Sequence, residues 1–377
     1  MTLEIIPVSN KRLLKAFIKV PWPIYRDDGA WRAPLVMERL MALSPKSPVF
    51  DHLDWQAWIA RRDGRPVGRI TAQIDALHQA QHDEGTGFFG LIEGEDDPDL
   101  FDTLFKTAED WLRHRGMQRI IGPINLNINQ EIGLLTEGHD TPPYVMMGHA
   151  RPYYRQRIEA LGYRPCQHLL AYEAANAFEE PRAIAAQRKR LARRIALRPL
   201  DRARKAADLE RMRSIFNDAW ADNWGFVPFT EREFQALGQV LLAVVPNDLI
   251  WLAEIEGEAV GFIVMLPNIN DAVADLNGRL LPWGWAKLLW RLKARLPSSG
   301  RVPLMGVRRQ LQDGPLGAGV AMSLIHRTAQ AALGHGITTS ETSWILEDNK
   351  GMRAIMERIG GVISKRYTVY EKSLVPP

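Results

Sequence analysis

The chain has 377 residues, of which 46% are hydrophobic and 24% are charged, and its formal net charge is +4. This length predicts two domains, and this composition is typical of a globular protein. No apolar run is long enough to span a bilayer and the start of the chain has no signal-peptide pattern, so we expect a cytoplasmic protein. The single cysteine, Cys166, excludes an internal disulfide.

The first half of the chain alternates strand and helix patterns. Two apolar strands flank Asp63-Gly64, a dipeptide that favours a tight hairpin turn. Further on, Leu100, Leu104 and Leu112 recur at helical spacing. The predicted elements are a strand, a helix and an aromatic loop (1–48), a hairpin (55–76), a strand (88–93), a helix (97–115), a strand (119–122), a helix (150–162) and a strand (163–172).

The second half repeats this order of elements. Gly334 and Gly336 end its longest helical run, and Gly360-Gly361 ends the last one. The repetition predicts two copies of one fold. The elements predicted here are a helix (209–220), a hairpin (249–266), a strand (302–307), a glycine-rich turn (314–319), a helix (318–333), a strand (337–346), a helix (351–359) and a strand (362–372).

The glycine-rich turn lies between a strand and a helix. Such a turn presents free backbone N–H groups and the positive end of the helix dipole, and glycines let a phosphate approach the backbone closely. Arg308 and Arg309 add positive charge beside it. The turn has neither the Gly-Lys-Ser/Thr of a P-loop nor the spacing of a dinucleotide motif. A tight connection in an α/β fold would show the same pattern, so the turn alone leaves both interpretations open.

The order of elements from Val302 to Lys372, with its glycine turn and asparagine-capped helix, resembles the second half of a GNAT acyltransferase domain. In that family the turn holds the pyrophosphate of coenzyme A, with the motif Gln/Arg-x-x-Gly-x-Gly/Ala. Gly317 and Gly319 match the two later positions, whereas Gly314 stands where Gln or Arg is usual. The resemblance implies that acyl-CoA is bound by Val307, Arg308, Arg309, Gly314, Gly317, Ala318, Gly319 and Asn349.

The resemblance also implies an α/β (α+β) fold class, with two tandem GNAT folds that are each a mixed, mostly antiparallel sheet flanked by helices. We expect an N-terminal domain (1–175), a basic linker (176–195) and a C-terminal domain (196–377). The N-terminal copy has the acidic run 93–97 where the C-terminal copy has its glycine turn. Because carboxylates repel a pyrophosphate, we expect the first copy not to bind coenzyme A and to bind or support the acceptor substrate.

Several further segments are similar to a bacterial family of tandem GNAT acyltransferase-like proteins, over nearly the whole chain. They are Pro21-Trp22, Tyr25-Arg26-Asp27-Asp28, Gly122-Pro123-Ile124-Asn125, Asn129-Gln130-Glu131, Asp140-Thr141-Pro142-Pro143, Met147-Gly148-His149 and Pro152-Tyr153-Tyr154. Some members resemble bacterial ceramide synthases, which pass a long acyl chain from acyl-CoA to the amine of a sphingoid base. The resemblance implies an acyl-CoA-dependent N-acyltransferase of lipid metabolism, with no metal and with a lipid-like amine as acceptor.

Transfer of an acyl group from a thioester to an amine needs a deprotonated amine and a protonated leaving thiolate, and it needs no covalent intermediate. Glu341 is a candidate base because it lies in a strand expected at the sheet centre, where burial would raise its pKa. A structural hydrogen bond is its alternative role. Glu347 is a second candidate, although 347–349 also fits a helix cap. The helix after Asn349 lacks the tyrosine that acts as the acid in the family, so the acid comes from elsewhere or from water. Tyr367 and Tyr370 in the last strand are the candidates, with packing as their alternative role.

The segment from Gly122 to His149 is polar for its expected position beside the sheet. Asn125, Asn127 and Asn129 alternate, so they would share one strand face. We interpret the segment as an amine pocket contributed by the first copy, whose substrate-binding residues are Asn125, Asn129, Glu131, His149 and Tyr153. An asparagine-rich loop that satisfies its own backbone is the alternative.

Residues Leu280–Leu296 form a basic, tryptophan-containing amphipathic pattern. The residues expected on its apolar face are Trp285, Leu288, Leu289, Leu292 and Leu296, and those on its basic face are Lys287, Arg291 and Arg295. Such a helix suits an anionic membrane surface, with the protein peripheral on the inner membrane face, or the mouth of an acyl-chain channel; an ordinary surface helix is the alternative. The basic run at 188–194 is most simply a solvated linker helix, and contact with anionic lipid is the second interpretation. We expect no nucleic-acid partner, because no recognition module accompanies the run.

Two other functions fit parts of the pattern. Aminoacyltransferases that extend peptidoglycan bridges also use tandem GNAT folds, and a protein of that type would bind tRNA and not coenzyme A. A degenerate GNAT protein that binds acyl-CoA without turnover would fit the glycine at position 314 and the missing tyrosine acid.

Overall fold

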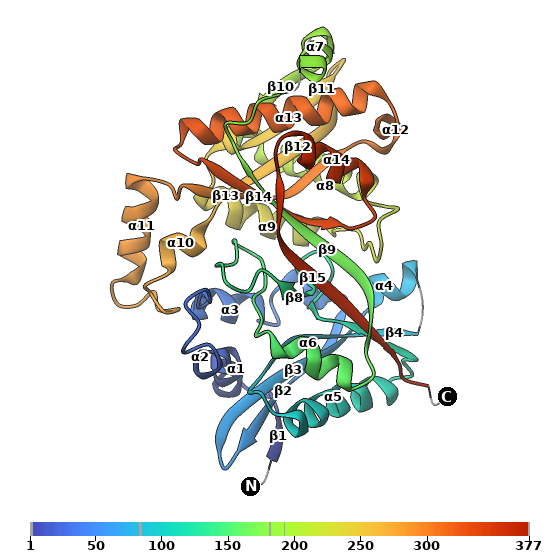
Figure 1. Ribbon diagram of the computed structural model, residues 1–377, viewed down its shortest axis with the longest axis vertical. Coiled ribbons are helices and arrows are strands. Elements are labelled where there is room, and N and C mark those ends of the chain that lie inside the picture. Colours follow the sequence, from blue (N-terminus) through green and yellow to red (C-terminus); the bar gives the residue numbers. More distant parts are fainter. Residues whose placement is uncertain (1–2, 83–84, 181, 192, 376–377) are drawn as a thin grey trace. The chain divides into compact units, whose positions relative to one another are not determined.

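The computed structural model describes residues 3–82, 85–180, 182–191 and 193–375, which fold into two compact units (Figure 1). The N-terminal unit comprises Met1–Leu169, Val273–Gly284 and Lys365–Pro377, and the C-terminal unit comprises Leu170–Ala272 and Trp285–Ser364. The strands β9 (Arg164–Ala175) and β15 (Val362–Ser373) contribute residues to both. Half of the expected linker is α7 (Arg182–Leu191), and residues 181 and 192 lie outside the described residues.

The N-terminal unit combines one large sheet with six helices among its described residues. Apart from its parts of β9 and β15, its strands are β1 (Leu3–Pro7), β2 (Leu53–Arg62), β3 (Arg65–Asp75), β4 (Thr86–Gly94), β5 (Arg119–Gly122), β6 (Ile124–Asn125), β7 (Glu131–Ile132) and β8 (Leu134–Glu137). Its helices are α1 (Lys11–Lys19), α2 (Pro21–Ile24), α3 (Val36–Ala42), α4 (Ala76–Gln81), α5 (Pro98–Arg113) and α6 (Tyr153–Ala160), with a 3₁₀ helix at Pro48–Asp51.

The sheet of this unit has the strand order β1-β2-β3-β4-β5-β15. Strands β1 to β4 are antiparallel neighbours, β4 and β5 are parallel, and β15 lies antiparallel to β5. The β2–β3 hairpin turns at Asp63 and Gly64, which both have a positive φ (49° and 79°), as a two-residue hairpin turn of this type requires. The turn predicted from the sequence is therefore confirmed.

Helix α5 connects the parallel strands β4 and β5. Asp97 caps its first turn by accepting the backbone N–H groups of Asp99 and Leu100. Apolar residues at helical spacing then bury one side of the helix on the sheet. These buried residues are Leu100, Phe101, Leu104, Phe105, Ala108 and Leu112. The amphipathic helix expected over this segment is therefore confirmed.

The C-terminal unit has the same kind of architecture. Apart from its parts of β9 and β15, its strands are β10 (Ala196–Pro199), β11 (Ile250–Ile255), β12 (Glu258–Pro267), β13 (Ser299–Val307) and β14 (Thr339–Leu346). With α7, its helices are α8 (Lys205–Ala219), α9 (Glu231–Val244), α10 (Ile269–Val273), α11 (Gly284–Ala294), α12 (Arg309–Gln312), α13 (Pro315–Gly334) and α14 (Lys350–Arg358), with 3₁₀ helices at Arg202–Arg204 and Asn247–Leu249.

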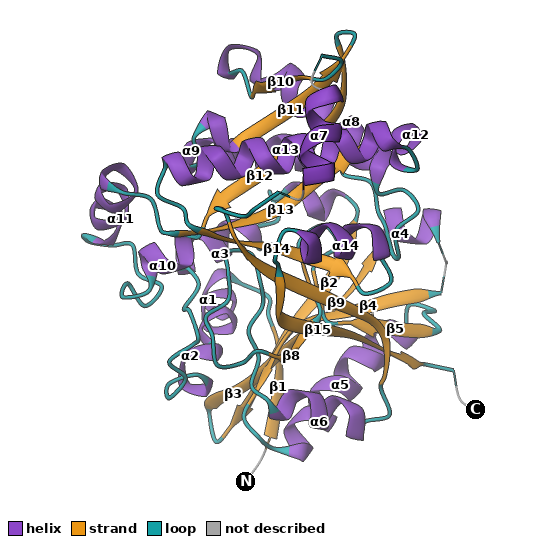
Figure 2. Ribbon diagram, turned by 45° about the horizontal axis from the view of Figure 1, so that its top comes forward, coloured by secondary structure: helices purple, strands orange, loops and turns teal. Residues whose placement is uncertain are grey.

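Its strand order is β14-β13-β12-β11-β10, and β13 and β14 are the parallel pair, connected by α13. A Cβ at Gly261 of β12 would meet Val320 of α13, whereas a Cβ at Gly306, which pairs with the next residue of β12, would meet Ile215 of α8. Because neighbouring strand residues point to opposite faces, α13 and α8 cover opposite faces of this sheet (Figure 2).

The two units repeat one order of elements. In each, antiparallel strands are followed by a parallel pair joined by a helix, as β4–α5–β5 in the N-terminal unit and as β13–α13–β14 in the C-terminal unit. The duplication predicted from the sequence is therefore visible in the strand order itself. It also makes the loop before α5 and the loop before α13 equivalent positions.

Candidate functional site

The glycine-rich turn leads from β13 through α12 into α13. Gly314 is the N-cap of α13 with an extended backbone (φ −117°, ψ 161°), and Pro315 takes the first helical position. Among the described residues no side chain caps this helix end, and the N–H groups of Leu316 and Gly317 have no acceptor there. These two donors and the helix dipole make the end of α13 suited to an anion.

Two of the three glycines are required by packing. A Cβ at Gly317 would lie 2.0 Å from the carbonyl oxygen of Leu311, and a Cβ at Gly319 would lie 2.4 Å from Leu191 of α7. At Gly314 the nearest atom would be 3.7 Å away, which is an ordinary contact. Gly314 is therefore the position in this turn that accepts a side chain without displacing its surroundings.

Replacing Gly317 with alanine is expected to lower the free energy of unfolding by about 1–3 kcal/mol, because the new Cβ overlaps a backbone oxygen. Gly334→Ala, at the other end of α13, is the matched control, since a Cβ there meets nothing within 4 Å and alanine favours a helix by up to about 1 kcal/mol over glycine. Chemical denaturation of both variants measures the difference. An unchanged free energy of unfolding for Gly317→Ala would show that α12 can move away from the new Cβ without loss of stability.

Arg308 and Arg309 are engaged by α8 and the residues that follow it. The guanidinium of Arg308 donates to the carbonyl and hydroxyl oxygens of Ser214 at 3.0 and 2.9 Å. Arg309 donates its backbone N–H to Asp218 at 2.8 Å and pairs its side chain with Asp222 at 2.7 Å. The second pair is exposed on both sides, and exposed pairs contribute little. The side chain of Arg309 can therefore exchange Asp222 for another anion, whereas Arg308 is fixed.

The equivalent loop of the N-terminal unit ends in Asp97. One carboxylate oxygen of Asp97 accepts the N–H groups of Asp99 and Leu100 at 2.9 and 3.3 Å, and the other pairs with Arg62. The donors that are free at the start of α13 are thus occupied at the start of α5. That the first copy does not hold coenzyme A stays a prediction, and this exchange of aspartate for glycine gives it a physical basis.

Glu341 lies in β14 and is completely buried. Its Oε1 accepts the hydroxyl of Ser343 at 2.5 Å and lies 4.0 Å from the guanidinium of Arg301, which is itself buried. Arg301 also donates to the hydroxyl and carbonyl oxygens of Ser343. These contacts match the alternative role of Glu341 as a structural hydrogen-bonding group, and its role as a base stays a prediction.

The other residues predicted from the C-terminal segment are Asn349, Glu347 and Tyr367. Asn349 caps α14 by accepting the N–H of Met352 at 3.0 Å, which confirms the predicted cap. Glu347 follows β14 and is half-buried. Tyr367 belongs to the N-terminal unit, where its buried hydroxyl donates to the carbonyl of Gly148 at 3.3 Å. The catalytic roles of Glu347 and Tyr367 and the cofactor role of Asn349 stay predictions.

The asparagines after β5 do not share a strand face. The two-residue strands β6 and β7 pair with each other, and residues 126–130 form a turn between them whose first residue has a φ of 77°. Asn125 accepts the N–H of Leu91 at 2.7 Å, and Asn127 accepts the N–H of Asn129 at 3.2 Å. The strand interpretation is therefore wrong, because short amide side chains hydrogen-bond the local backbone and favour a turn. The alternative of a self-satisfied loop is confirmed for Asn127.

Glu131 lies against Gly148, the residue that precedes His149. A Cβ at Gly148 would be 3.0 Å from Oε1 of Glu131, so the carboxylate lies against the chain just before His149. The Nε2 atom of His149 lies 3.0 Å from Oδ2 of Asp28. No local pattern in the sequence joins Asp28 to His149, because the two residues are 121 positions apart.

A buried polar cluster adjoins this pair. Glu93 accepts the hydroxyls of Tyr25 and Tyr154 at 2.8 and 2.7 Å. Burial raises the pKa of Glu93, and the charge of Arg69 and the two hydroxyls oppose that rise only in part. Tyr153 donates its hydroxyl to the carbonyl of the residue after Glu93 at 2.7 Å. These bonds anchor α6 to the end of β4, and the role of Tyr153 toward a substrate stays a prediction.

Helix α11 has no fully buried residue. Leu288, Arg291 and Leu292 are half-buried on its inner side, where Arg291 donates to the carbonyl of Ala272 at 2.6 Å. The predicted separation into one apolar and one basic face is therefore wrong. Arg291 turns inward to bond the backbone, and apolar residues lie on both sides of the helix.

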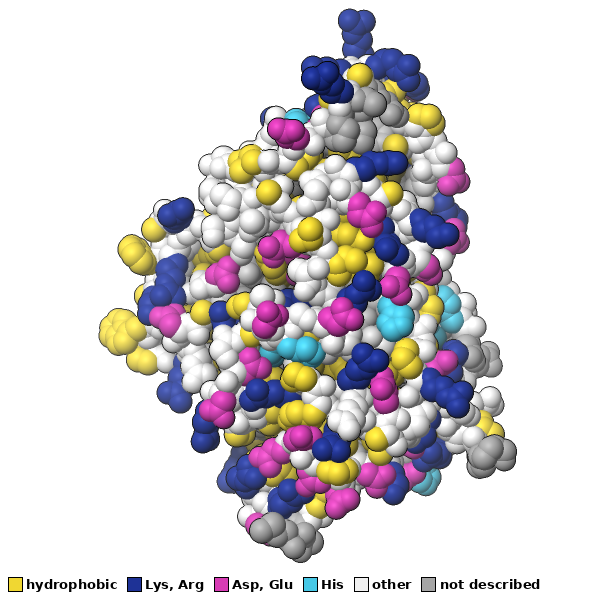
Figure 3. Space-filling view, in the orientation of Figure 1, with side chains coloured by type: hydrophobic (Ala, Val, Ile, Leu, Met, Phe, Trp, Pro, Cys, Tyr) yellow, Lys and Arg dark blue, Asp and Glu magenta, His cyan; other side chains and the backbone are white. Residues whose placement is uncertain are grey.

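The outward side of α11 carries Trp285, Leu289 and Trp290, which are 52%, 48% and 70% exposed. Lys287 and Lys293 are exposed on the same helix. In Figure 3, yellow and dark blue side chains project together at the left edge, where Figure 1 draws α11. Within the described ranges we find no helix with the length and apolar character needed to traverse a bilayer.

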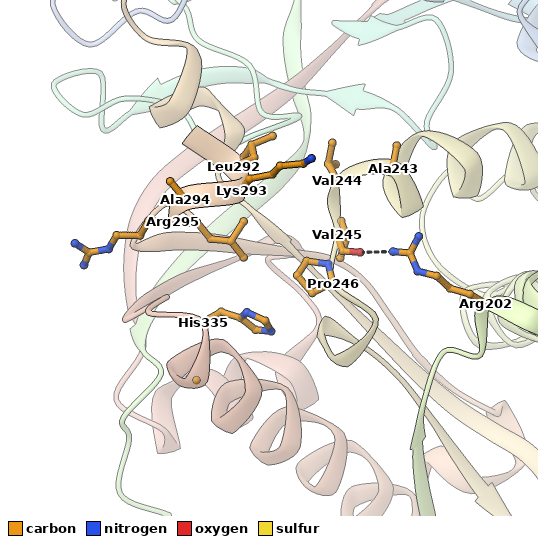
Figure 4. A pocket seen from close by; sticks show the side chains of 12 residues that line it. Arg202, Ala243, Val244, Val245, Pro246, Leu292, Lys293, Ala294, Arg295 and His335 are labelled. Carbon is orange, nitrogen blue, oxygen red and sulfur yellow. Dashed lines mark hydrogen bonds between the residues drawn. The ribbon is translucent and has the colours of Figure 1, made fainter. Parts of the chain in front are cut away.

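A pocket of about 510 Å³ lies in the C-terminal unit (Figure 4). It is lined by Arg202 and by the ends of α9, α11 and α13 with the residues that follow them: Ala243–Pro246, Leu292–Leu296, Gly334 and His335. Arg202 crosses one wall and donates to the carbonyl of Val245 at 3.0 Å. The pocket lies at the opposite end of α13 from the glycine turn, about 30 Å along the helix. It contains none of the residues predicted to bind coenzyme A.

Comparison with known proteins identifies the family. No protein-family model matches the chain. Protein YghO of Escherichia coli (strain K12) is 48% identical over 97% of this chain and 94% of its own length. Bacterial ceramide synthase of Caulobacter vibrioides is 47% identical over 99% of this chain and 98% of its own length. A solved tandem GNAT protein from the clavulanic acid biosynthesis pathway covers 100% of both chains with a TM-score of 0.59 at 11% identity, a likeness of fold. The chain therefore has the predicted tandem GNAT fold and belongs to the acyltransferase family that contains protein YghO and the Caulobacter bacterial ceramide synthase.

Proposed function

We propose that the chain transfers a long acyl chain from acyl-CoA to the amine of a sphingoid-type lipid base. The observation that carries this proposal is the 47% identity, over 99% of the chain, with the bacterial ceramide synthase of Caulobacter. The geometry supports it from two sides. The start of α13 offers unoccupied donors for a pyrophosphate, and the N-terminal unit holds a carboxylate and an imidazole close together, which suits an amine.

Acyl-CoA is the proposed donor substrate. Its pyrophosphate accepts the N–H groups of Leu316 and Gly317 at the start of α13, and the exchangeable guanidinium of Arg309 adds a positive charge. The wider donor site consists of Val307, Arg308, Gly314, Ala318, Gly319 and Asn349. Within it Gly317 and Gly319 act indirectly, because their absent side chains make room for Leu311 and Leu191.

The proposed acceptor site lies in the N-terminal unit. Glu131 is half-buried and faces the segment of His149, and a carboxylate in such a place attracts an ammonium group. Asn125, Asn129 and Tyr153 complete the proposed site as hydrogen-bonding groups. Tyr367 is the proposed proton donor to the leaving thiolate, since its hydroxyl already lies against Gly148 in the same unit.

Helix α11 is the proposed contact with an anionic membrane surface. Exposed Trp and Leu side chains on a helix favour the boundary between headgroups and acyl chains, and neighbouring lysines attract anionic headgroups. A membrane contact fits a lipid-like acceptor, because such a base resides in the bilayer. The protein would then be peripheral, held on one membrane face.

Release of free thiol from acyl-CoA tests the reaction. Purified protein is incubated with acetyl-CoA, octanoyl-CoA or palmitoyl-CoA, each with and without a long-chain amino-alcohol base, and the N-acetylated base serves as the control that lacks a free amine. We expect release that requires both the long acyl chain and the free amine. Release that ignores the base, or no release from any acyl-CoA, would overturn the proposal.

A further inference from the structure

The side chain of His149 is nearly inaccessible to solvent, at 3% exposure, and its Nε2 lies 3.0 Å from Oδ2 of Asp28. The other oxygen of Asp28, Oδ1, accepts the backbone N–H groups of Ala30 and Trp31 at 3.0 and 3.2 Å. Both carboxylate oxygens therefore act as acceptors. This fixes the proton of the imidazole on Nε2, which donates it to Asp28.

The second ring nitrogen, Nδ1, is then an unprotonated acceptor. It is buried, and no hydrogen-bond partner for it exists in the described part of the chain. Buried polar atoms are rarely left without a partner. An imidazole that is locked at one nitrogen and open at the other has the arrangement of a general base awaiting a donor.

Charged and titratable groups surround His149 from every element packed around it. They are Asp28 and Arg151 from the flanking loops, Glu131 of β7, His139, Lys365 of β15 and the ring of Tyr25. Burial lowers the pKa of His149, the charges of Lys365 and His139 act in the same direction, and the bond to Asp28 opposes them in part. The imidazole is therefore neutral at neutral pH and able to accept a proton.

Lys365 also holds the loop that carries His149. Its buried amine donates to the carbonyl of Gly138 at 2.6 Å and to the carbonyl of Thr141 at 2.8 Å. Tyr367 of the same strand donates to the carbonyl of Gly148. The loop that leads to the histidine is thus tied to β15 at three residues, Gly138, Thr141 and Gly148, which restricts the position of Nδ1.

We propose that Nδ1 of His149, oriented by Asp28, accepts the proton that the acceptor amine loses, and that Glu131 attracts that amine as its cation. This proposal rests on the proposed function and extends it by naming the base. Asp28 is a positioning residue, since it acts through His149. The base then comes from the N-terminal copy of the fold, whose equivalent of the glycine turn is closed by Asp97.

In the proposed reaction the acceptor nitrogen loses two protons. The acceptor arrives as an ammonium ion, and Nδ1 takes one proton to leave a neutral amine and an imidazolium. The amine nitrogen attacks the thioester carbonyl, the C–N bond forms, and the C–S bond breaks with its electron pair on sulfur. The second proton lost by nitrogen ends on the thiolate, and the imidazolium returns the first to solvent. Acyl-CoA and ammonium thus give an amide, free coenzyme A and one proton.

Two substitutions separate this role from a structural one. In His149→Gln the amide N–H can still donate to Asp28, while the titrating nitrogen is lost. In Asp28→Asn the side-chain oxygen still accepts from Ala30 and Trp31, but the amide N–H now faces Nε2 and moves the imidazole proton to Nδ1. We expect kcat to fall about 100-fold or more in His149→Gln and about 10-fold or more in Asp28→Asn, with KM for acyl-CoA unchanged.

The pH profile of kcat and nitrogen NMR distinguish a base from a structural residue, because both measurements respond to the protonation of the imidazole. In the unsubstituted enzyme kcat should decrease as the pH is lowered below the ordinary pKa range of histidine, because the imidazole becomes protonated. This decrease at acidic pH should be absent in His149→Gln. NMR of protein with labelled histidine should show that Nδ1 of His149 is unprotonated in the unsubstituted protein. In Asp28→Asn it should show that Nδ1 is protonated. His168→Gln and Asp27→Asn, both at exposed residues, are the matched controls and should keep full activity.

The outcomes are distinct. If the unsubstituted enzyme releases no thiol with a free amine, the proposed function fails and this inference with it. If it is active and His149→Gln keeps its turnover or the decrease of kcat at acidic pH, the base is another group, while the proposed function stands. If His149→Gln does not fold, the tautomer measured in the unsubstituted protein and in Asp28→Asn decides: a proton on Nδ1 in the unsubstituted enzyme overturns the inference.

Discussion

Replacing Gly314 with aspartate is expected to lower the affinity for acyl-CoA by about 100-fold or more while leaving the fold intact. The backbone at Gly314 already has the extended conformation of an N-cap, so the new carboxylate should accept the N–H groups of Leu316 and Gly317. Two hydrogen bonds to a charged pyrophosphate, each about 1.5–3 kcal/mol, would be lost. The variant reproduces at α13 the arrangement that Asp97 makes at α5.

Calorimetric titration with coenzyme A measures this affinity, and Gly314→Asn is the matched control. Asparagine has the same size and also caps a helix, but it carries no charge, so a smaller loss of affinity is expected. Thermal unfolding should show both variants at or above the stability of the unsubstituted chain, since a capped helix is more stable. Unchanged affinity in Gly314→Asp would place the pyrophosphate away from this turn. A lower melting temperature would instead indicate damage to the fold.

The features that the sequence predicted well are local. The hairpin turn at Asp63-Gly64 needs two residues that tolerate positive φ, and the asparagine cap at Asn349 needs one short side chain at a helix start. Each is decided within four residues of chain, so its pattern is complete in the sequence. The duplication followed because the same succession of such local signals occurs twice, and the strand order of both units bears this out.

The misinterpreted features depend on partners far away in the sequence. Alternation of Asn125 with Asn127 fits a strand equally well, and the turn is fixed by contacts such as that of Asn125 with Leu91. The basic face predicted for 280–296 includes Arg291, yet this residue turns inward to the carbonyl of Ala272, 19 residues earlier. A helical wheel cannot show which side of a helix meets the rest of the protein, so it could not place Arg291 on the inner side of α11 together with Leu288 and Leu292.

The glycine turn shows that a sequence pattern does not reveal the structural reason for each of its residues. The turn lies between a strand and a helix as predicted. Gly317 makes room for a backbone carbonyl and Gly319 for Leu191 of α7, which precedes it by 128 positions. Replacing either glycine with aspartate would therefore test packing and ligand binding together. The structure moves the informative substitution to Gly314, the position where the sequence departs from the usual motif.

The second large effect is expected at α11, where Leu289→Glu combined with Trp290→Glu should reduce binding to anionic vesicles by about 100-fold or more. Each removed side chain would otherwise bury apolar surface worth about 1.5–3 kcal/mol, and the new carboxylates are repelled by anionic headgroups. Co-sedimentation with vesicles that contain phosphatidylglycerol measures the binding. The substitutions should leave the fold unaffected, since both side chains are about half or more exposed.

Val240→Glu is the matched control, because Val240 is a 63% exposed apolar residue of the same unit outside α11. Its vesicle binding should equal that of the unsubstituted chain. Lys287→Gln combined with Lys293→Gln should weaken binding to anionic vesicles and leave the weaker binding to neutral vesicles unchanged, since only the headgroup attraction is removed. If the α11 variant still binds vesicles as tightly as the Val240 control, the exposed tryptophans serve some other contact, and the lipid base must reach the enzyme without docking through this helix.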